Sequence, residues 1–273
     1  MNGRGISDLI PTFDRNKRMT EKTFTDQVAI ITGAGQGIGF EIARQLTAVG
    51  ASVILNDIDP ELTARACDEI QKSGGNCLPF AGDASDITFI ERLIQEAVSK
   101  FGQLNMAIAN AGITLFGEFL TYPPDDFRKV MDLNLFGTFF LTQRAAIQMK
   151  KQGRGGRILL MSSVTGHQAH KNLAAYGMTK AGIEMFAKSL VVELSSDNIS
   201  INTIAPGATL TERTRAETDY EKTWSRITPL GKPATVADIA HAALFFLSPA
   251  SGHITGQSLI VDGGWTATSP TPY

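Results

Sequence analysis

The sequence predicts a single doubly wound α/β domain, in which a seven-stranded parallel sheet is flanked by helices. From Asp26 onward, short runs of β-branched and aliphatic residues alternate with longer segments of helical period, as in repeated strand–helix–strand units. The chain has 273 residues, and single α/β domains routinely reach about 250 residues. No repeat, low-complexity tract or proline/glycine linker divides residues 25–273. We therefore expect one domain over residues 25–273, preceded by an extension over residues 1–24 that is flexible or contacts another subunit.

Seven short apolar runs have the composition of buried strands. They cover residues 28–32, 52–56, 76–81, 104–110, 157–162, 199–205 and 257–261. The first helix is expected to begin at Gly37 and to end before Gly50. Its apolar residues recur on one stripe that would pack on the sheet, and they are Ile38, Ile42, Leu46 and Val49.

Two later helical segments, residues 124–150 and 175–195, are apolar around more of their circumference than one sheet requires. We expect a neighbouring subunit to cover the remaining apolar surface, so the sequence predicts a homotetramer or a dimer. The polar segment 212–228 is the candidate for a mobile lid over a binding site. Residues 266–273, with Pro270 and Pro272, form either a loose terminus or a short subunit contact.

Charge and composition argue against several classes of partner. The formal net charge is −2 and the sequence pI is near 6.1, whereas proteins that bind nucleic acid or anionic lipid usually carry a basic excess. The two cysteines and four histidines show no metal-ligand spacing, and such cysteines usually stay reduced inside cells. Residues 1–24 have no secretory apolar run, and no stretch approaches a membrane span. We expect a cytoplasmic protein without metal, nucleic-acid or membrane partners.

A glycine-rich turn follows the first predicted strand and opens the first predicted helix. It reads Thr-Gly-Ala-Gly-Gln-Gly-Ile-Gly over residues 32–39, and glycines at such a place let backbone N–H groups approach a pyrophosphate at a helix N-terminus. The spacing is not G-x-G-x-x-G, because Ile38 stands at the third glycine position counted from Gly33. A dinucleotide site and a plain tight connection are both compatible with this turn alone.

Asp57 ends the second predicted strand, where a carboxylate can accept hydrogen bonds from the hydroxyls of an adenosine ribose. Its charge would repel a 2′-phosphate, and Gln36 rather than a cation stands in the glycine turn. Its neighbours Asn56 and Ile58 are also uncharged. These features favour NAD over NADP as cofactor. The alternative is that Asp57 only caps a turn before Pro60.

Tyr176 and Lys180 lie four residues apart on a predicted helix, so both side chains project from one face. Through space, a lysine ammonium so placed can lower the pKa of a tyrosine phenol. Ser163 ends a predicted strand thirteen residues before Tyr176, where its hydroxyl can bind a substrate oxygen. A tyrosine and a lysine one turn apart also occur by chance, so the pair gains its weight from Ser163.

These motifs resemble those of the classical short-chain dehydrogenases/reductases over essentially all of residues 25–273. The matching positions, in family order and spacing, are Thr32 through Gly39, Asp83, Asn110-Ala111-Gly112, Asn134, Ser163, Tyr176 with Lys180, Pro206-Gly207 and the closing run 256–264. The resemblance implies a Rossmann-type fold. The resemblance is weakest at the level of the branch within the family, where the chain is most similar to glucose, gluconate and ribitol dehydrogenases.

The resemblance also assigns roles to individual residues. It implies that Tyr176 is the general acid/base and that Ser163 is the donor to the substrate oxygen. Lys180 would tune the tyrosine and hold the nicotinamide ribose, while Asn134 would keep a water beside it for proton relay. The implied cofactor-binding residues are Gly33, Gln36, Gly37, Ile38, Gly39, Asp57, Asp83, Ala84, Asn110, Gly112, Tyr176, Lys180, Pro206, Gly207, Thr209 and Thr211.

The expected function is therefore NAD-dependent interconversion of a secondary alcohol and a ketone, on a sugar, polyol or similar small polar substrate. A 3-ketoacyl-thioester reductase shares nearly every motif, but Asp57 argues against it because those enzymes usually take NADPH. A non-catalytic dinucleotide-binding protein would have no use for Ser163, Tyr176 and Lys180 together. Residues 113–116 are expected to shape the substrate pocket. His167 and His170 either contact substrate or lie in a solvated loop.

Overall fold

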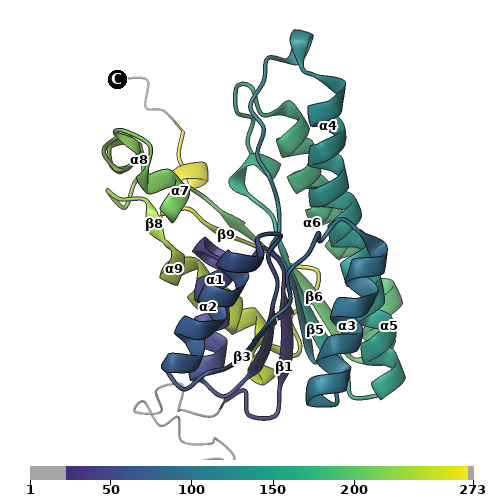
Figure 1. Ribbon diagram of the computed structural model, residues 1–273. Helices are drawn as coiled ribbons and strands as arrows, with labels where there is room; N and C mark the ends of the chain where they lie inside the picture. The colour runs from purple at the N-terminus through teal and green to yellow at the C-terminus, as the bar shows by residue number, and fades with distance from the viewer. Residues whose placement is uncertain (1–22, 270–273) are drawn as a thin grey trace, which may run out of the picture.

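A computed structural model describes residues 23–269 and contains the expected seven-stranded sheet (Figure 1). Its strands are β1 (Val28–Ile31), β2 (Ser52–Leu55), β3 (Asn76–Pro79), β4 (Met106–Ala109), β5 (Gly156–Met161), β6 (Ile199–Pro206) and β9 (Ser258–Val261). All pairs are parallel, in the order β3-β2-β1-β4-β5-β6-β9. The predicted fold class is confirmed. The expected N-terminal extension lies outside the described residues except at its last two positions, as do residues 270–273 of the tail.

Helices cover both faces of the sheet, which explains why its central strands are apolar throughout. One core lies beneath α1 (Gly37–Ala48), α2 (Pro60–Lys72) and α9 (Val236–Leu247). The other lies beneath α3 (Ile87–Phe101), α5 (Thr138–Gln152) and α6 (Ala174–Leu194). Figure 1 shows the two groups on opposite sides of the sheet. All four residues of β1 are buried, so this strand contributes to both cores.

The direction of chain winding reverses at β1, because β2 and β3 lie on one side of it and β4 on the other. At such a reversal, the loops that leave the carboxyl ends of neighbouring strands turn in opposite directions and leave a crevice between them. The glycine turn follows β1, and Asn110 follows β4. The fold thus places these two segments on either side of the crevice.

The predicted continuous helix over residues 124–150 is wrong in one respect. The structure has α4 (Pro124–Met131), a π-helical segment (Asp132–Gly137) and then α5. At Gly137 an added Cβ would lie 2.4 Å from the carbonyl oxygen of Ala84, so the backbone packs closely here. The wider turn coincides with Asn134, whose buried side chain forms hydrogen bonds to the backbone of Ile113. π-Bulges of this kind are frequent at functional sites.

The sequence did not reveal a second, two-stranded sheet, formed by β7 (Thr209–Leu210) and β8 (Ala234–Thr235). Strands of two residues are too short to show a periodic pattern. The predicted lid segment, residues 212–228, forms α7 (Glu212–Arg215) and α8 (Tyr220–Ile227). Figure 1 shows both helices beyond the carboxyl end of the sheet.

Large apolar side chains are exposed on the helices that the sequence marked as unusually apolar. Phe136, Phe139 and Ile147 are exposed on the π-helical segment and α5, and Met185 and Val192 on α6. Whether another subunit covers them stays a prediction. Within residues 23–269, no helix combines the length and the apolar character needed to span a membrane.

Candidate active site

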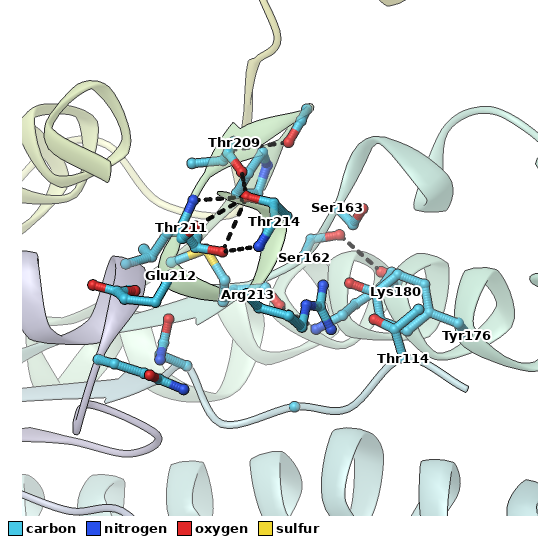
Figure 2. Close-up of a pocket in the computed structure, with 18 of the residues that line it drawn as sticks. Thr114, Ser162, Ser163, Tyr176, Lys180, Thr209, Thr211, Glu212, Arg213 and Thr214 are labelled. Atoms are coloured by element: carbon cyan, nitrogen blue, oxygen red, sulfur yellow. Dashed lines mark hydrogen bonds between the residues drawn. The ribbon is translucent and has the colours of Figure 1, made fainter. Parts of the chain in front are cut away.

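A cleft of about 420 Å³ lies at the carboxyl edge of the sheet and brings together segments from six parts of the chain (Figure 2). Of the residues singled out in the sequence, those lining it are Gln36, Gly37, Ile38, Asn110, Gly112, Ser163, Tyr176, Lys180, Pro206, Gly207, Thr209 and Thr211. Gly33, Gly39, Asp57, Asp83, Ala84 and Asn134 lie outside this lining. The cleft thus contains the predicted catalytic trio together with one end of the predicted dinucleotide site.

The glycine turn is held against the loop that follows β4. Asn110 Nδ2 donates hydrogen bonds to the carbonyl oxygens of Thr32 at 3.0 Å and Gly33 at 2.7 Å. An added Cβ at Gly39 would lie 2.5 Å from Asn110 Nδ2, so this contact requires glycine. Gln36 precedes α1, and its side chain does not cap the helix. The first N–H groups of a helix have no intrahelical partner, so the start of α1 fits a pyrophosphate.

Asp57 is half-buried beside the glycine turn. Its Oδ2 accepts a hydrogen bond from the Gly35 N–H at 3.1 Å, and its Oδ1 is 3.3 Å from the Asp59 nitrogen. The cap of α2 is Asp59 instead, because its Oδ1 accepts hydrogen bonds from the first turn of that helix. The bond from the Asp59 N–H is one that a turn-capping carboxylate accepts, so the turn-capping alternative for Asp57 is compatible with the structure. The Asp57 carboxylate still retains lone pairs for a ligand.

The two residues expected near the adenine follow β3. Asp83 Oδ1 accepts hydrogen bonds from the backbone N–H and the hydroxyl of Ser85, at 2.8 and 2.7 Å. Ala84 is buried and packs against Gly137 at the end of the π-helical segment. Both residues lie beyond the described cleft.

Lys180 is a buried cation on the same helix face as Tyr176. Its Nζ donates a 2.7 Å hydrogen bond to the carbonyl oxygen of Met161, the last residue of β5. It lies 5.4 Å from the centre of the Tyr176 ring. Burial lowers the pKa of Lys180, while the charge of an ionised Tyr176 acts in the opposite direction. The lysine ammonium is thus fixed beside the tyrosine, as the spacing of four residues predicted.

Ser163 lies two residues after the end of β5 and lines the same cleft as Tyr176 (Figure 2). Its side chain is buried, and Oγ accepts a hydrogen bond from the Thr165 N–H at 3.2 Å. The hydroxyl proton is therefore available to donate to an oxygen in the cleft. The structure brings Ser163, Tyr176 and Lys180 into one site, although they come from a strand end and a helix.

Asn134 lies behind the cleft. Its side chain accepts a hydrogen bond from the Ile113 N–H at 2.8 Å and donates one to the Ile113 carbonyl at 2.9 Å. An added Cβ at Gly112 would lie 3.2 Å from Asn134 Oδ1 and 3.4 Å from Lys180 Nζ. Asn134 and Lys180 therefore converge on the space behind Gly112, and a side chain at residue 112 would press on the Asn134 amide.

Threonine hydroxyls organise the opposite wall of the cleft. Thr211 caps α7, and Thr214 returns a hydrogen bond to form a capping box. Thr214 Oγ1 also lies 2.9 Å from the Thr209 carbonyl oxygen. An added Cβ at Gly207 would lie 2.6 Å from the Cβ of Asp262. This wall is consequently fixed by contacts within the chain.

Several residues line the cleft to which the sequence assigned no individual role. They are Thr114, Met161, Ser162, Glu212, Arg213, Thr214 and Tyr220. Thr114 falls within residues 113–116, which the sequence already marked as pocket-forming. Glu212, Arg213, Thr214 and Tyr220 lie in or beside the expected lid, but no local pattern distinguishes the inward side chains from its other polar residues.

A buried carboxylate, Glu184, links the turn after β5 to α6. Glu184 Oε1 accepts a 2.7 Å hydrogen bond from Ser162 Oγ and lies 2.8 Å from His167 Nε2. His167 is exposed, as the solvated-loop interpretation expects, and its ring also contacts this carboxylate on α6. His170 is half-buried: its ring centre lies 5.0 Å from that of Trp265, and burial lowers the pKa of His170. Neither histidine lines the cleft.

Replacing Glu184 with alanine should lower the melting temperature of the protein by several degrees. The change removes the hydrogen bond from the buried Ser162 hydroxyl to a carboxylate, which is worth about 1.5–3 kcal/mol, and leaves that hydroxyl its 3.1 Å contact with the Lys180 carbonyl oxygen. Each kcal/mol shifts the melting temperature of a domain this large by about 2–4 °C. Glu184→Gln should lower the melting temperature less, because its amide oxygen can still accept the hydrogen bond from Ser162. Thermal unfolding followed by circular dichroism measures both.

The matched control is Glu193→Ala, on an exposed position of the same helix, where substitutions usually change stability by no more than about 0.5 kcal/mol. Equal melting temperatures for Glu184→Ala and Glu193→Ala would show that the buried carboxylate does not link the turn to α6.

The chain is similar to known proteins over most of its length. The family model described as enoyl-(acyl carrier protein) reductase matches residues 33–266. The chain is 37% identical to the 7α-hydroxysteroid dehydrogenase of Escherichia coli K12 over 238 residues, which cover 86% of this chain and 92% of the relative. It is 36% identical to the L-rhamnose-1-dehydrogenase of Scheffersomyces stipitis over 250 residues, covering 87% and 95%.

Solved structures show the same fold. A gluconate 5-dehydrogenase from Burkholderia cenocepacia, in complex with NADP and tartrate, superposes with a TM-score of 0.84 at 29% identity, covering 91% of this chain and 99% of that chain. A 7α-hydroxysteroid dehydrogenase complexed with NADH and 7-oxo glycochenodeoxycholic acid gives 0.83 at 37% identity, covering 88% and 94%. This chain therefore belongs to the short-chain dehydrogenase/reductase family and is an NAD(P)-dependent oxidoreductase that acts on CH–OH groups.

Proposed function

We propose that this enzyme uses NAD to interconvert a secondary alcohol and a ketone, on a sugar, polyol or similar small polar substrate. The observation that carries the proposal is the convergence of Ser163, Tyr176 and Lys180 on a cleft that the start of α1 also lines. Threonine, serine and asparagine side chains form much of the cleft wall, which suits a substrate with several hydroxyls. Two similar proteins are named for sugar or sugar-acid substrates.

In the proposed reaction, Tyr176 accepts the proton of the substrate hydroxyl, and Ser163 donates a hydrogen bond to the same oxygen. The buried Lys180 ammonium lies 5.4 Å from the centre of the ring whose phenol accepts this proton. Asn134 would hold a water behind Gly112 that relays the proton away from Lys180. The nicotinamide ring supplies the acceptor for the hydride that leaves the carbinol carbon. Reduction of a ketone runs through the same groups in reverse.

The cofactor-binding roles inferred from the sequence fit the positions of these residues. Gly33, Gln36, Gly37, Ile38 and Gly39 would hold the pyrophosphate at the start of α1. Asp83 and Ala84 would lie against the adenine, while Asn110 and Gly112 would line the cleft beside the cofactor. The wall formed by Pro206, Gly207, Thr209 and Thr211 would hold the nicotinamide end.

We propose NAD rather than NADP, and with it an alcohol dehydrogenase rather than a ketoacyl-thioester reductase. Similar proteins occur with either cofactor, one solved with NADH and another with NADP. In this chain the half-buried Asp57 would meet the adenosine ribose, and the exposed side chain next to it is the uncharged Ile58. A 2′-phosphate would thus meet a carboxylate with no cation from either neighbour to offset the repulsion.

We further propose that the enzyme is cytoplasmic and homotetrameric or dimeric. Its two cysteines, Cys67 and Cys77, are both buried and do not form a disulfide, as is usual for proteins of a reducing compartment. The exposed Phe136, Phe139 and Val192 form part of an apolar surface on the π-helical segment, α5 and α6 that a second copy would cover.

Replacing Tyr176 with phenylalanine should lower kcat by at least about a hundredfold, the usual scale of a lost general acid/base. Only the hydroxyl is removed, so the dissociation constant of NADH, measured by fluorescence titration, should stay nearly unchanged. Steady-state turnover on the best alcohol found in a substrate panel supplies kcat. Near wild-type turnover by Tyr176→Phe would exclude the proposed role of the phenol.

Changing Asp57 to serine and Ile58 to arginine together should reverse the cofactor preference. The double variant removes the repulsive carboxylate and adds a cation for the 2′-phosphate. The kcat/KM for NADP should therefore rise and that for NAD should fall, and their ratio should change by the equivalent of roughly a few kcal/mol. The measurement is kcat/KM for both cofactors in both proteins. A wild-type enzyme that prefers NADP would contradict this interpretation of Asp57 and favour the ketoacyl-thioester reductase instead.

A further inference from the structure

The catalytic half of the cleft contains a cation that the proposed mechanism does not use. Arg213, on α7, lines the same cleft as Ser163, Tyr176 and Lys180. Its side chain is exposed. The ion pairs formed by the described residues all involve other side chains, so within residues 23–269 the charge of Arg213 has no paired carboxylate. It is available to a ligand in the cleft.

The backbone that carries Arg213 is held in place by its neighbours. Thr211 and Thr214 form the capping box of α7, and Thr214 is buried with its hydroxyl bonded to the Thr209 carbonyl. Glu212 and Arg213 are adjacent in sequence, yet Figure 2 shows their side chains pointing in opposite directions. Glu212 Oε2 lies 3.7 Å from the position of an added Cβ at Gly37, beside the glycine turn. Arg213 points toward the side where Tyr176 and Lys180 lie.

The other charged groups of the cleft do not substitute for Arg213 or neutralise it. Lys180 is buried and its ammonium already donates to the Met161 carbonyl. Glu212 is directed toward the pyrophosphate end of the cleft. Tyr220 lines the cleft next to Arg213, and burial raises the pKa of Tyr220, so this phenol stays neutral and can donate a hydrogen bond. The catalytic end therefore offers one free guanidinium and one phenol hydroxyl from the lid.

We propose that the substrate carries a carboxylate that Arg213 binds while its secondary carbinol lies against Ser163 and Tyr176. A guanidinium pairs with a carboxylate through two parallel hydrogen bonds, which would fix the orientation of a small hydroxy acid. The inference rests on the proposed function and narrows its substrate class to sugar acids and related hydroxy acids. The gluconate 5-dehydrogenase of similar fold was solved with tartrate, a hydroxy acid.

The carboxylate takes no part in the chemistry of this proposal. The carbinol C–H bond breaks with transfer of a hydride to NAD, the O–H proton passes to Tyr176, and the products are a keto acid and NADH. Arg213 binds only the unreacting end of the molecule. Its removal should therefore change the affinity for charged substrates far more than the turnover of neutral ones.

Calorimetric titration of the enzyme–NADH complex with tartrate and with threitol tests the charge directly. The two probes share four carbons and the central hydroxyls, and differ in that carboxylates replace terminal alcohols. Tartrate should bind more tightly than threitol to the wild type. Arg213→Met should weaken the binding of tartrate about tenfold or more, which is the effect of losing a charge-assisted hydrogen bond. It should leave the affinity for threitol unchanged. Arg213→Lys should restore part of the loss.

Arg215→Met is the matched control, because Arg215 lies on the same short helix but does not line the cleft. It should leave tartrate affinity unchanged. The inference is overturned if threitol binds as tightly as tartrate, or if Arg213→Met weakens both probes equally. It is also overturned if Arg213→Met weakens NADH itself and spares tartrate, because Arg213 would then serve the pyrophosphate.

Kinetics separate this inference from the proposed function. Wild-type kcat/KM for aldonates should exceed that for alditols of equal chain length, and Arg213→Met should raise KM for aldonates alone. If the enzyme oxidises alditols and shows no preference for aldonates, the inference that its substrate carries a carboxylate is overturned, while the proposed function stands. Absence of turnover on every alcohol, despite NADH binding, would overturn both.

Discussion

The site depends above all on the burial of one charge, the Lys180 ammonium. Burying a cation is costly unless it is bonded and compensated, and here the Met161 carbonyl accepts a 2.7 Å hydrogen bond from it. That bond ties α6 to the end of β5, so Tyr176 on the helix and Ser163 after the strand acquire a fixed relation. The ring of Tyr176 lies 5.4 Å from the ammonium. Asn134 and Lys180 also lie close behind Gly112, where an added Cβ would be 3.2 Å from Asn134 Oδ1 and 3.4 Å from Lys180 Nζ.

Other hydrogen bonds between side chains and backbone also fix segments around the cleft. Asn110 bonds to the glycine turn, Asn134 to the backbone of Ile113, and Thr214 to the carbonyl oxygen of Thr209. Glu184 adds a link between Ser162 and His167 behind the catalytic helix. All but the Thr214 bond join segments distant in sequence, so the folded chain holds the walls of the cleft in place without a ligand.

Structural features that depend on residues close together in the sequence could be predicted, whereas features that depend on contacts between distant segments could not. The seven strands and the start of α1 at Gly37 follow from runs and spacings within a few residues. The pairing of Tyr176 with Lys180 follows from helical period. In contrast, the π-helical segment reflects the packing of Gly137 on Ala84, and the partner of His167 is a carboxylate seventeen residues away on another element. Arg213 was hidden among other charged residues of the lid, because only the folded cap of α7 shows which of them points inward.

In the proposed reaction the carbinol hydrogen passes directly as hydride to the nicotinamide while Tyr176 takes the proton. Oxidation of an alcohol deuterated at the carbinol carbon, followed by proton NMR of the NADH formed, tests this most directly. We expect one deuterium at C4 of the nicotinamide, on a single face of the ring, with none lost to water. Release of the label into solvent, or its distribution over both faces, would contradict this mechanism.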